Sequence, residues 1–167
     1  EPVAAAAKGS SRMISVLKRA AAAPAPGTPD EFRYFYKDDV LRLDAGALDR
    51  VRQRLLSGAK RNQAYARAPQ ALVDVLWNQV SGERALEKGK AEFADIISTD
   101  NRFVDFVEGW WPAVEAVEVW RTLPTLIDRY GGGFSRAERE ALTASWRSGV
   151  PAIEDVPLID ELRYLIG

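Results

Sequence analysis

Apolar residues recur at helical spacing in short segments of this chain, and proline- and glycine-rich stretches separate those segments. Residues 24–29 hold three prolines in six positions, and residues 131–133 are three consecutive glycines. Proline lacks a backbone donor and glycine has high backbone freedom, so neither favours a helix interior. The pattern therefore predicts a mainly α, multi-helix, bundle-like domain.

The expected helices cover approximately residues 11–23, 45–60 and 69–88, short segments within 91–109, one segment after Pro112, one after Gly133 and one within 153–167. Their first residues carry side chains that accept hydrogen bonds from free helix N–H groups, and these predicted caps are Asp44, Asp100, Ser135 and Asp155. Pro157 suits the first turn of the final helix.

Residues 32–43 have a different periodicity. Phe32, Tyr34 and Tyr36 alternate with Arg33, Phe35 and Lys37, and residues 37–39, Lys-Asp-Asp, supply a turn. This pattern predicts one small β-hairpin at about 32–43. Because an isolated hairpin is marginally stable in water, we expect it to lie against helices.

The chain has 167 residues and contains neither cysteine nor histidine. Disulfides, thiolate chemistry, the usual general base and the commonest zinc ligand are therefore excluded. No catalytic, cofactor-binding or metal-binding residue is predicted, so this chain is not expected to be an enzyme by itself. No apolar run is long enough for a membrane span, and we expect a cytoplasmic protein without a membrane partner.

Two short motifs resemble nucleotide-binding elements. Residues 156–161, Val-Pro-Leu-Ile-Asp-Glu, look superficially like a Walker B strand, but Pro157 cannot donate in a central strand. The three glycines at 131–133 precede a helix without the lysine of a phosphate-binding loop. A helix and a helix connection, respectively, are the favoured interpretations.

Charge is unevenly distributed along the chain. Residues 42–67 contain seven Lys or Arg and two Asp, a net charge of +5, whereas residues 68–128 contain eleven acids and five bases, a net charge of −6. The candidate binding residues are Arg50, Arg54, Lys60 and Arg61, which could neutralise phosphates or acidic protein side chains. A solvated helix face is the alternative interpretation.

Aromatic residues supply a second group of candidates. Core packing is the favoured interpretation of the tryptophans, but Trp110 and Trp111 are adjacent and cannot share one helix face, so both are candidate interface aromatics, one of which would be exposed. Tyr34 and Tyr36 of the hairpin are also candidate interface aromatics.

Several segments together resemble one family. Residues 6–13, Ala-Ala-Lys-Gly-Ser-Ser-Arg-Met, are similar to the "LKGDxRM" segment that opens the insertion region of actinobacterial HelD-type proteins. The hairpin with its arginine-rich helix, Trp111-Pro112 and the tract Pro157-Leu-Ile-Asp-Glu161 resemble later parts of that region in the same order. The customary Trp-Thr before the last tract is replaced by residues 151–153, Pro-Ala-Ile.

HelD-type proteins are UvrD-like, superfamily 1 helicase-related ATPases that bind RNA polymerase and recycle it. The resemblance implies that residues 1–167 form one α-helical insertion domain of a larger protein, with residues 153–167 leading back into the motor domain. It also implies that ATP and Mg²⁺ bind Walker motifs outside this chain. The implied partners are RNA polymerase, DNA or both, and the remaining motor domains of the same protein.

Two hypotheses stay open from the sequence. One is a non-catalytic insertion that binds RNA polymerase and promotes its release from nucleic acid. The other is a nucleic-acid-binding accessory domain of a superfamily 1 DNA helicase. Phosphate contacts should weaken more steeply with salt than a mixed protein interface does.

Overall fold

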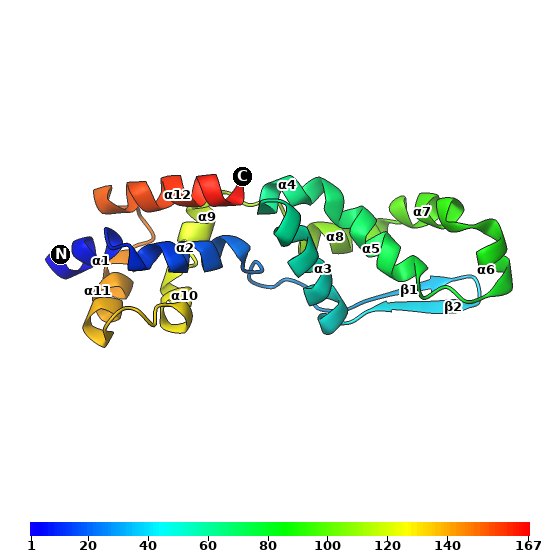
Figure 1. Cartoon of the computed structure of the whole chain (residues 1–167), viewed down its shortest axis with the longest axis horizontal. Coiled ribbons are helices and arrows are strands. Elements are labelled where there is room, and N and C mark those ends of the chain that lie inside the picture. The colour runs from blue at the N-terminus through cyan, green and yellow to red at the C-terminus, as the bar shows by residue number, and fades with distance from the viewer. The chain divides into compact units, whose positions relative to one another are not determined.

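The computed structural model describes all 167 residues and is mainly helical with one two-stranded hairpin, as predicted (Figure 1). The chain divides into two compact units. Unit 1 combines residues 1–23 with residues 114–167, and unit 2 consists of residues 24–113. Each unit has its own cluster of buried apolar side chains. No helix is long and apolar enough to cross a membrane.

Unit 2 contains the hairpin and most of the candidate residues. Its elements are β1 (Phe32–Tyr36), β2 (Asp39–Leu43), α3 (Ala45–Gly58), α4 (Arg61–Ala64), a 3₁₀ turn (Tyr65–Arg67), α5 (Ala68–Trp77), α6 (Glu83–Lys88), α7 (Lys90–Ser98) and α8 (Asn101–Trp110). The predicted caps form here: the Asp44 carboxylate accepts the Ala47 N–H at 2.8 Å, and Asp100 accepts the Arg102 N–H at 2.8 Å.

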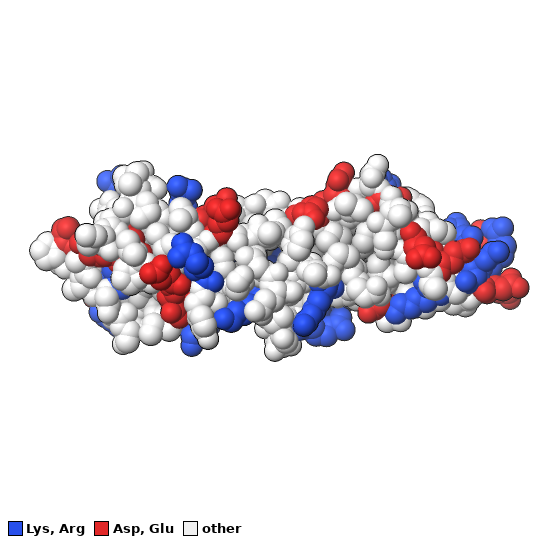
Figure 2. Space-filling view, turned by 90° about the horizontal axis from the view of Figure 1, so that it is seen from above, with Lys and Arg blue, Asp and Glu red and all other residues white.

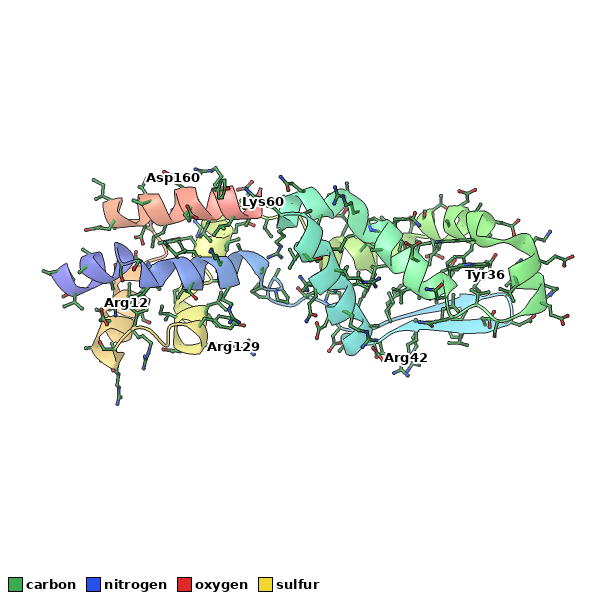
Figure 3. The ribbon with its side chains drawn as sticks, viewed as in Figure 1. Arg12, Tyr36, Arg42, Lys60, Arg129 and Asp160 are labelled. Atoms are coloured by element: carbon green, nitrogen blue, oxygen red, sulfur yellow. The ribbon has the colours of Figure 1, made fainter.

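The hairpin follows the alternation in its sequence. Its strands pair antiparallel with Tyr34 opposite Leu41 and Phe35 opposite Val40. Phe32, Tyr34 and Tyr36 are buried against the helices, while the intervening residues are exposed. Figure 3 shows Tyr36 pointing from the hairpin toward the helices and Arg42 pointing away from them. One face of the hairpin is therefore part of the unit 2 core, and the other meets solvent.

The single helix expected over residues 69–88 is two helices, α5 and α6. The carboxylate of Asp39 in the hairpin accepts the Gly82 N–H at 3.0 Å and the Ser81 hydroxyl at 3.0 Å. Gly82 has an extended backbone conformation and begins α6. The helix prediction was wrong here because a contact from a strand more than 40 residues away binds the N–H groups of the break. In α6, Ala85 is buried and Leu86 is exposed.

Unit 1 is built from two distant pieces of chain. Its helices are α1 (Pro2–Lys8), α2 (Arg12–Ala22), α9 (Ala116–Trp120), α10 (Leu123–Tyr130), α11 (Arg136–Trp146) and α12 (Val156–Ile166), with a 3₁₀ turn (Ile153–Asp155) before α12. α2 packs against α9, α10 and α12, and α1 packs against α11. The sequence predicted no helix at α1, whose N–H groups are capped by the side chain of Glu1.

A buried carboxylate joins the two pieces of unit 1. Asp155 Oδ2 accepts from Lys8 Nζ at 2.9 Å, and Asp155 Oδ1 accepts from the indole Nε1 atoms of Trp146 at 2.9 Å and Trp120 at 3.2 Å. Lys8 also donates to Ser145 Oγ at 2.7 Å. Asp155 does precede α12, but its side chain makes no capping bond to that helix. Asp155 was predicted to cap α12, but its carboxylate instead accepts hydrogen bonds from Lys8, Trp120 and Trp146.

Two further predictions for unit 1 hold locally, whereas the one helical segment expected after Pro112 is two helices, α9 and α10. Ser135 and Glu138 form a capping box at the start of α11. Residues 156–166 are helical with Pro157 in the first turn, so the Walker-B-like motif is part of a helix. The prediction that residues 1–167 form one insertion domain of a longer protein concerns residues outside this chain, so it stays a prediction.

Candidate interaction surface

An open groove lies between α3 and α5 in unit 2. It has a volume of about 430 Å³, and its lining residues are Ala47, Arg50, Gln53, Arg54, Ser57 and Val75. A smaller pocket of about 180 Å³ adjoins it, since Arg54 lines both, and it adds Arg67, Ala71 and Asp74 among its lining residues. We call this pair of hollows the α3–α5 groove.

Helical geometry explains how Arg50 and Arg54 come together. They are four residues apart in α3, so their side chains leave the helix on the same face, one turn apart. Leu48 and Val51 of the same helix are buried, which fixes the opposite face in the core of unit 2. Both arginines are exposed, and neither forms an ion pair within the chain.

The one carboxylate in the groove is engaged elsewhere. Asp74 accepts from Lys90 Nζ at 2.6 Å and from Gln70 Nε2 at 2.8 Å. The hydrogen bond from Lys90 is the main reason that the pKa of Asp74 lies below its usual value, and the positive charge of Arg54 contributes. The carboxylate therefore stays ionised but does not form a direct ion pair with Arg54. The groove presents guanidinium groups beside a small apolar and hydroxyl surface.

The other two predicted cations are not in the groove. Lys60 is half-buried just before α4 and does not line either hollow. Arg61 is only 3% exposed, so its prediction as part of an exposed basic face was wrong. Burial first, and the nearby Arg52 cation second, lower the pKa of Arg61 to about 10. Helical spacing alone could not show that α3 ends at Gly58 and that the chain turns inward.

The predicted interface aromatics are all buried. Tyr34, Tyr36, Trp110 and Trp111 each belong to the core of unit 2. The favoured core interpretation of Trp110 and Trp111 is confirmed, and the alternative of one exposed tryptophan was wrong, because Trp111 follows the last helical residue and has a non-helical backbone. Its indole N–H donates to the Arg61 carbonyl at 2.9 Å. Two adjacent tryptophans can both be buried when the helix ends between them.

Arg52 was not predicted to have any role. Its guanidinium lies 5.3 Å from the ring centre of Trp110 and 4.9 Å from that of Trp111, and it donates to the Trp110 carbonyl at 3.3 Å. Such cation–π contacts stabilise a buried cation. The signal in the sequence was its position four residues after Leu48, which places both side chains on the same face of α3.

The exposed aromatic and aliphatic residues of the hairpin were also missed as surface features. Phe35 is 67% exposed and Val40 is 60% exposed, and they are cross-strand neighbours. Strand alternation does contain this signal, because Phe35 must point away from its buried neighbours Tyr34 and Tyr36. The exposed apolar side chains of the hairpin are therefore Phe35 and Val40, whereas the predicted interface residues Tyr34 and Tyr36 are buried.

Charges of both signs share the surface. Figure 2 shows acidic and basic side chains intermixed on the face in view, without a continuous basic stripe. Two of the seven cations of residues 42–67, Arg52 and Arg61, are buried, and Arg42 pairs with Glu31 at 2.9 Å. The basic region is therefore smaller than the sequence suggested. The structure contains no cluster of three or more carboxylates that could hold a metal ion.

No model of a known protein family matches this chain, and no curated protein is significantly similar to it in sequence.

Proposed function

We propose that this chain is a non-catalytic insertion domain of a HelD-like, superfamily 1 helicase-related ATPase. In this proposal the domain binds RNA polymerase and promotes its release from nucleic acid, while ATP and Mg²⁺ bind elsewhere in the intact protein. The order of family-like segments along the chain supports the family. The observation that carries a binding role is the α3–α5 groove with its exposed arginines Arg50 and Arg54.

The shape and chemistry of the groove favour a protein ligand. Two guanidinium groups one turn apart can each bind a carboxylate through paired N–H donors. Ala47, Val75 and Ser57 add apolar and hydroxyl surface between and beside them. A mixed lining of this kind fits an acidic protein segment with apolar side chains better than it fits a phosphate backbone alone.

Nucleic-acid binding is the second candidate. Arg50, Arg54 and Arg67 have no ion-pair partner within the chain, and phosphates would accept from all three. Against it stands the mixing of acidic and basic side chains on the surface in Figure 2. Nonspecific DNA binding depends on many phosphate contacts, and each one makes affinity fall further with salt.

The test measures binding of the whole chain to core RNA polymerase at low and moderate salt, with single-stranded and duplex DNA as competitors. Replacing Arg50→Glu and Arg54→Glu together should weaken polymerase binding at least tenfold. The matched control replaces Arg129→Glu and Arg136→Glu, two exposed arginines of unit 1, with the same change in net charge. The control should change affinity less than twofold.

Each outcome separates the candidates. Retention at moderate salt in the presence of DNA supports polymerase binding. Binding to DNA alone, lost steeply as salt rises, supports the accessory helicase domain instead. Equal losses in the groove variant and the control would contradict a role for the groove.

A further inference from the structure

The two edges of the β-hairpin differ in their hydrogen bonds to the rest of the fold. Gln79, in the break between α5 and α6, binds the outer edge of β2: the Arg42 N–H donates to Gln79 Oε1 at 2.7 Å, and Gln79 Nε2 donates to the Arg42 carbonyl at 2.6 Å. This side chain replaces a third strand at that position. Asp39 at the start of β2 is likewise bonded to residues 81 and 82.

The bonds of Arg42 also fix which groups of β1 point outward. Because both main-chain groups of Arg42 point away from β1, its opposite residue Arg33 is in a non-hydrogen-bonded pair. The N–H and C=O of Arg33 therefore point to the outer edge of β1, and those of Phe35, two residues on, do the same. No group in the chain forms a hydrogen bond with them.

This edge has little of the usual protection of an exposed strand. Proteins commonly shield such an edge with charged side chains, proline, a bulge or a covering segment, or keep the strand very short. The sequence of β1 is Phe-Arg-Tyr-Phe-Tyr, without proline or glycine, and its register to β2 has no bulge. Arg33 is its only charged residue, and the exposed side chain of Phe35 lies beside Val40 of β2.

We propose that the outer edge of β1 is a docking site for an extended segment of a partner protein, which adds to the hairpin as a third strand. An added antiparallel strand would form hydrogen-bonded pairs with Arg33 and Phe35. Its residue opposite Phe35 would extend the exposed row of Val40 and Phe35, and so should be apolar. Its residue opposite Arg33 should be acidic.

Charge complementarity supports this choice of ligand. Arg33 and Arg42 on the exposed face of the hairpin share a single carboxylate, Glu31, at 3.2 Å and 2.9 Å. The acids of the turn, Asp38 and Asp39, are bonded to Arg84 and to residues 81 and 82 instead, so one positive charge beside the β1 edge has no carboxylate of its own. A second copy of this chain fits less well, since a five-residue strand pair buries far less than the roughly 1,200 Å² of a stable interface. The proposal is independent of the α3–α5 groove and of RNA polymerase.

The experiment uses the full chain and a defined peptide, acetyl-Thr-Val-Thr-Glu-Thr-amide, followed by amide chemical shifts in NMR spectra. Paired antiparallel with β1, its valine lies opposite Phe35 and its glutamate opposite Arg33. Shifts should be largest at the Arg33 and Phe35 amides. N-methylation of the peptide's valine and glutamate removes the N–H groups that face β1, and should abolish the shifts. N-methylation of the first and last threonines, whose N–H groups point away from β1, should leave the affinity within about threefold.

A variant of the chain tests the side-chain preference. Arg33→Glu should weaken binding of the glutamate peptide at least fivefold and strengthen binding of the same peptide with lysine in place of glutamate. The proposal is overturned by three results: no shifts at several millimolar peptide, largest shifts at the α3–α5 groove, or equal binding of both N-methylated peptides. Shifts of Arg33 and Phe35 that depend on chain concentration without peptide would instead identify a second copy as the occupant, and so overturn the assigned ligand.

Discussion

At the scale of single residues, the Asp155 carboxylate accepts hydrogen bonds from four residues of unit 1. Burial alone would raise the pKa of this carboxyl group, but the hydrogen bonds from Lys8, the Ala152 N–H, Trp146 and Trp120 outweigh it. The pKa of Asp155 therefore lies below its usual value. Lys8 and Asp155 are both almost fully buried and form an ion pair at 2.9 Å.

Asp155→Asn should destabilise the chain by about 3–5 kcal/mol, because it leaves the Lys8 ammonium buried without a carboxylate. The double variant Asp155→Asn with Lys8→Met removes both charges and should recover part of that loss. Urea unfolding at pH 7, followed by intrinsic tryptophan fluorescence, measures both. An Asp155→Asn variant as stable as the parent would show that the ion pair contributes nothing.

The same carboxylate predicts a dependence on acid. A lowered pKa in the folded state means that Asp155 stabilises the fold above the usual aspartate pKa of about 3.9, and that this contribution disappears as pH falls below that value. Unfolding measured at pH 6 and pH 3 should show a larger loss for the parent chain than for the double variant. Equal losses would assign the acid sensitivity to other carboxylates.

Lys37 in the hairpin turn is the one residue other than glycine with a positive φ, at 50°. This left-handed conformation costs side chains other than glycine about 1 kcal/mol or more. Lys37→Gly should therefore stabilise the chain by about 0.5–1 kcal/mol in thermal or urea unfolding. Asp38→Gly is the matched control at the neighbouring turn position, where φ is not positive, and it should give no gain. A gain in both variants would point to a cause other than φ.

At the scale of elements, the end of α10 depends on one of the three glycines. A Cβ on Gly131 would overlap the Ile127 carbonyl oxygen, whereas a Cβ on Gly132 would have nothing within 4 Å. Gly131→Ala should lower stability by about 2 kcal/mol because the backbone must move to relieve the overlap. Gly132→Ala should be nearly neutral. Circular dichroism melts of the two variants would contradict this account if they coincided.

Element prediction succeeded where local chemistry decides and failed where distant residues do. The caps at Asp44, Asp100 and Ser135 form because the side chain and the N–H it binds are only a few residues apart. The break between α5 and α6 depends on Asp39, more than 40 residues away in the chain. Arg54 was placed correctly by helical spacing, but the groove around it needs α5 beside α3.

At the scale of the whole molecule, the two cores share no residue. The buried apolar side chains of unit 2 all come from residues 24–113, and those of unit 1 come from both ends of the chain. Residues 24–113 alone should therefore unfold cooperatively with a stability of a few kcal/mol, judged by near-UV circular dichroism and urea unfolding. Residues 1–23 alone should be unstructured. A residue 24–113 fragment without a cooperative transition would show that its core is incomplete.

The sequence by itself determined the helical class, the hairpin, most helix caps and the shared face of Arg50 and Arg54, because spacing and short-range hydrogen bonding specify them. Only the tertiary structure decided that Trp110, Trp111 and Arg61 are buried, that Asp155 serves Lys8 and two tryptophans, and that the β1 edge stays open. Those outcomes depend on which elements far apart in the chain pack together, and the periodicity of the sequence does not show which distant elements meet.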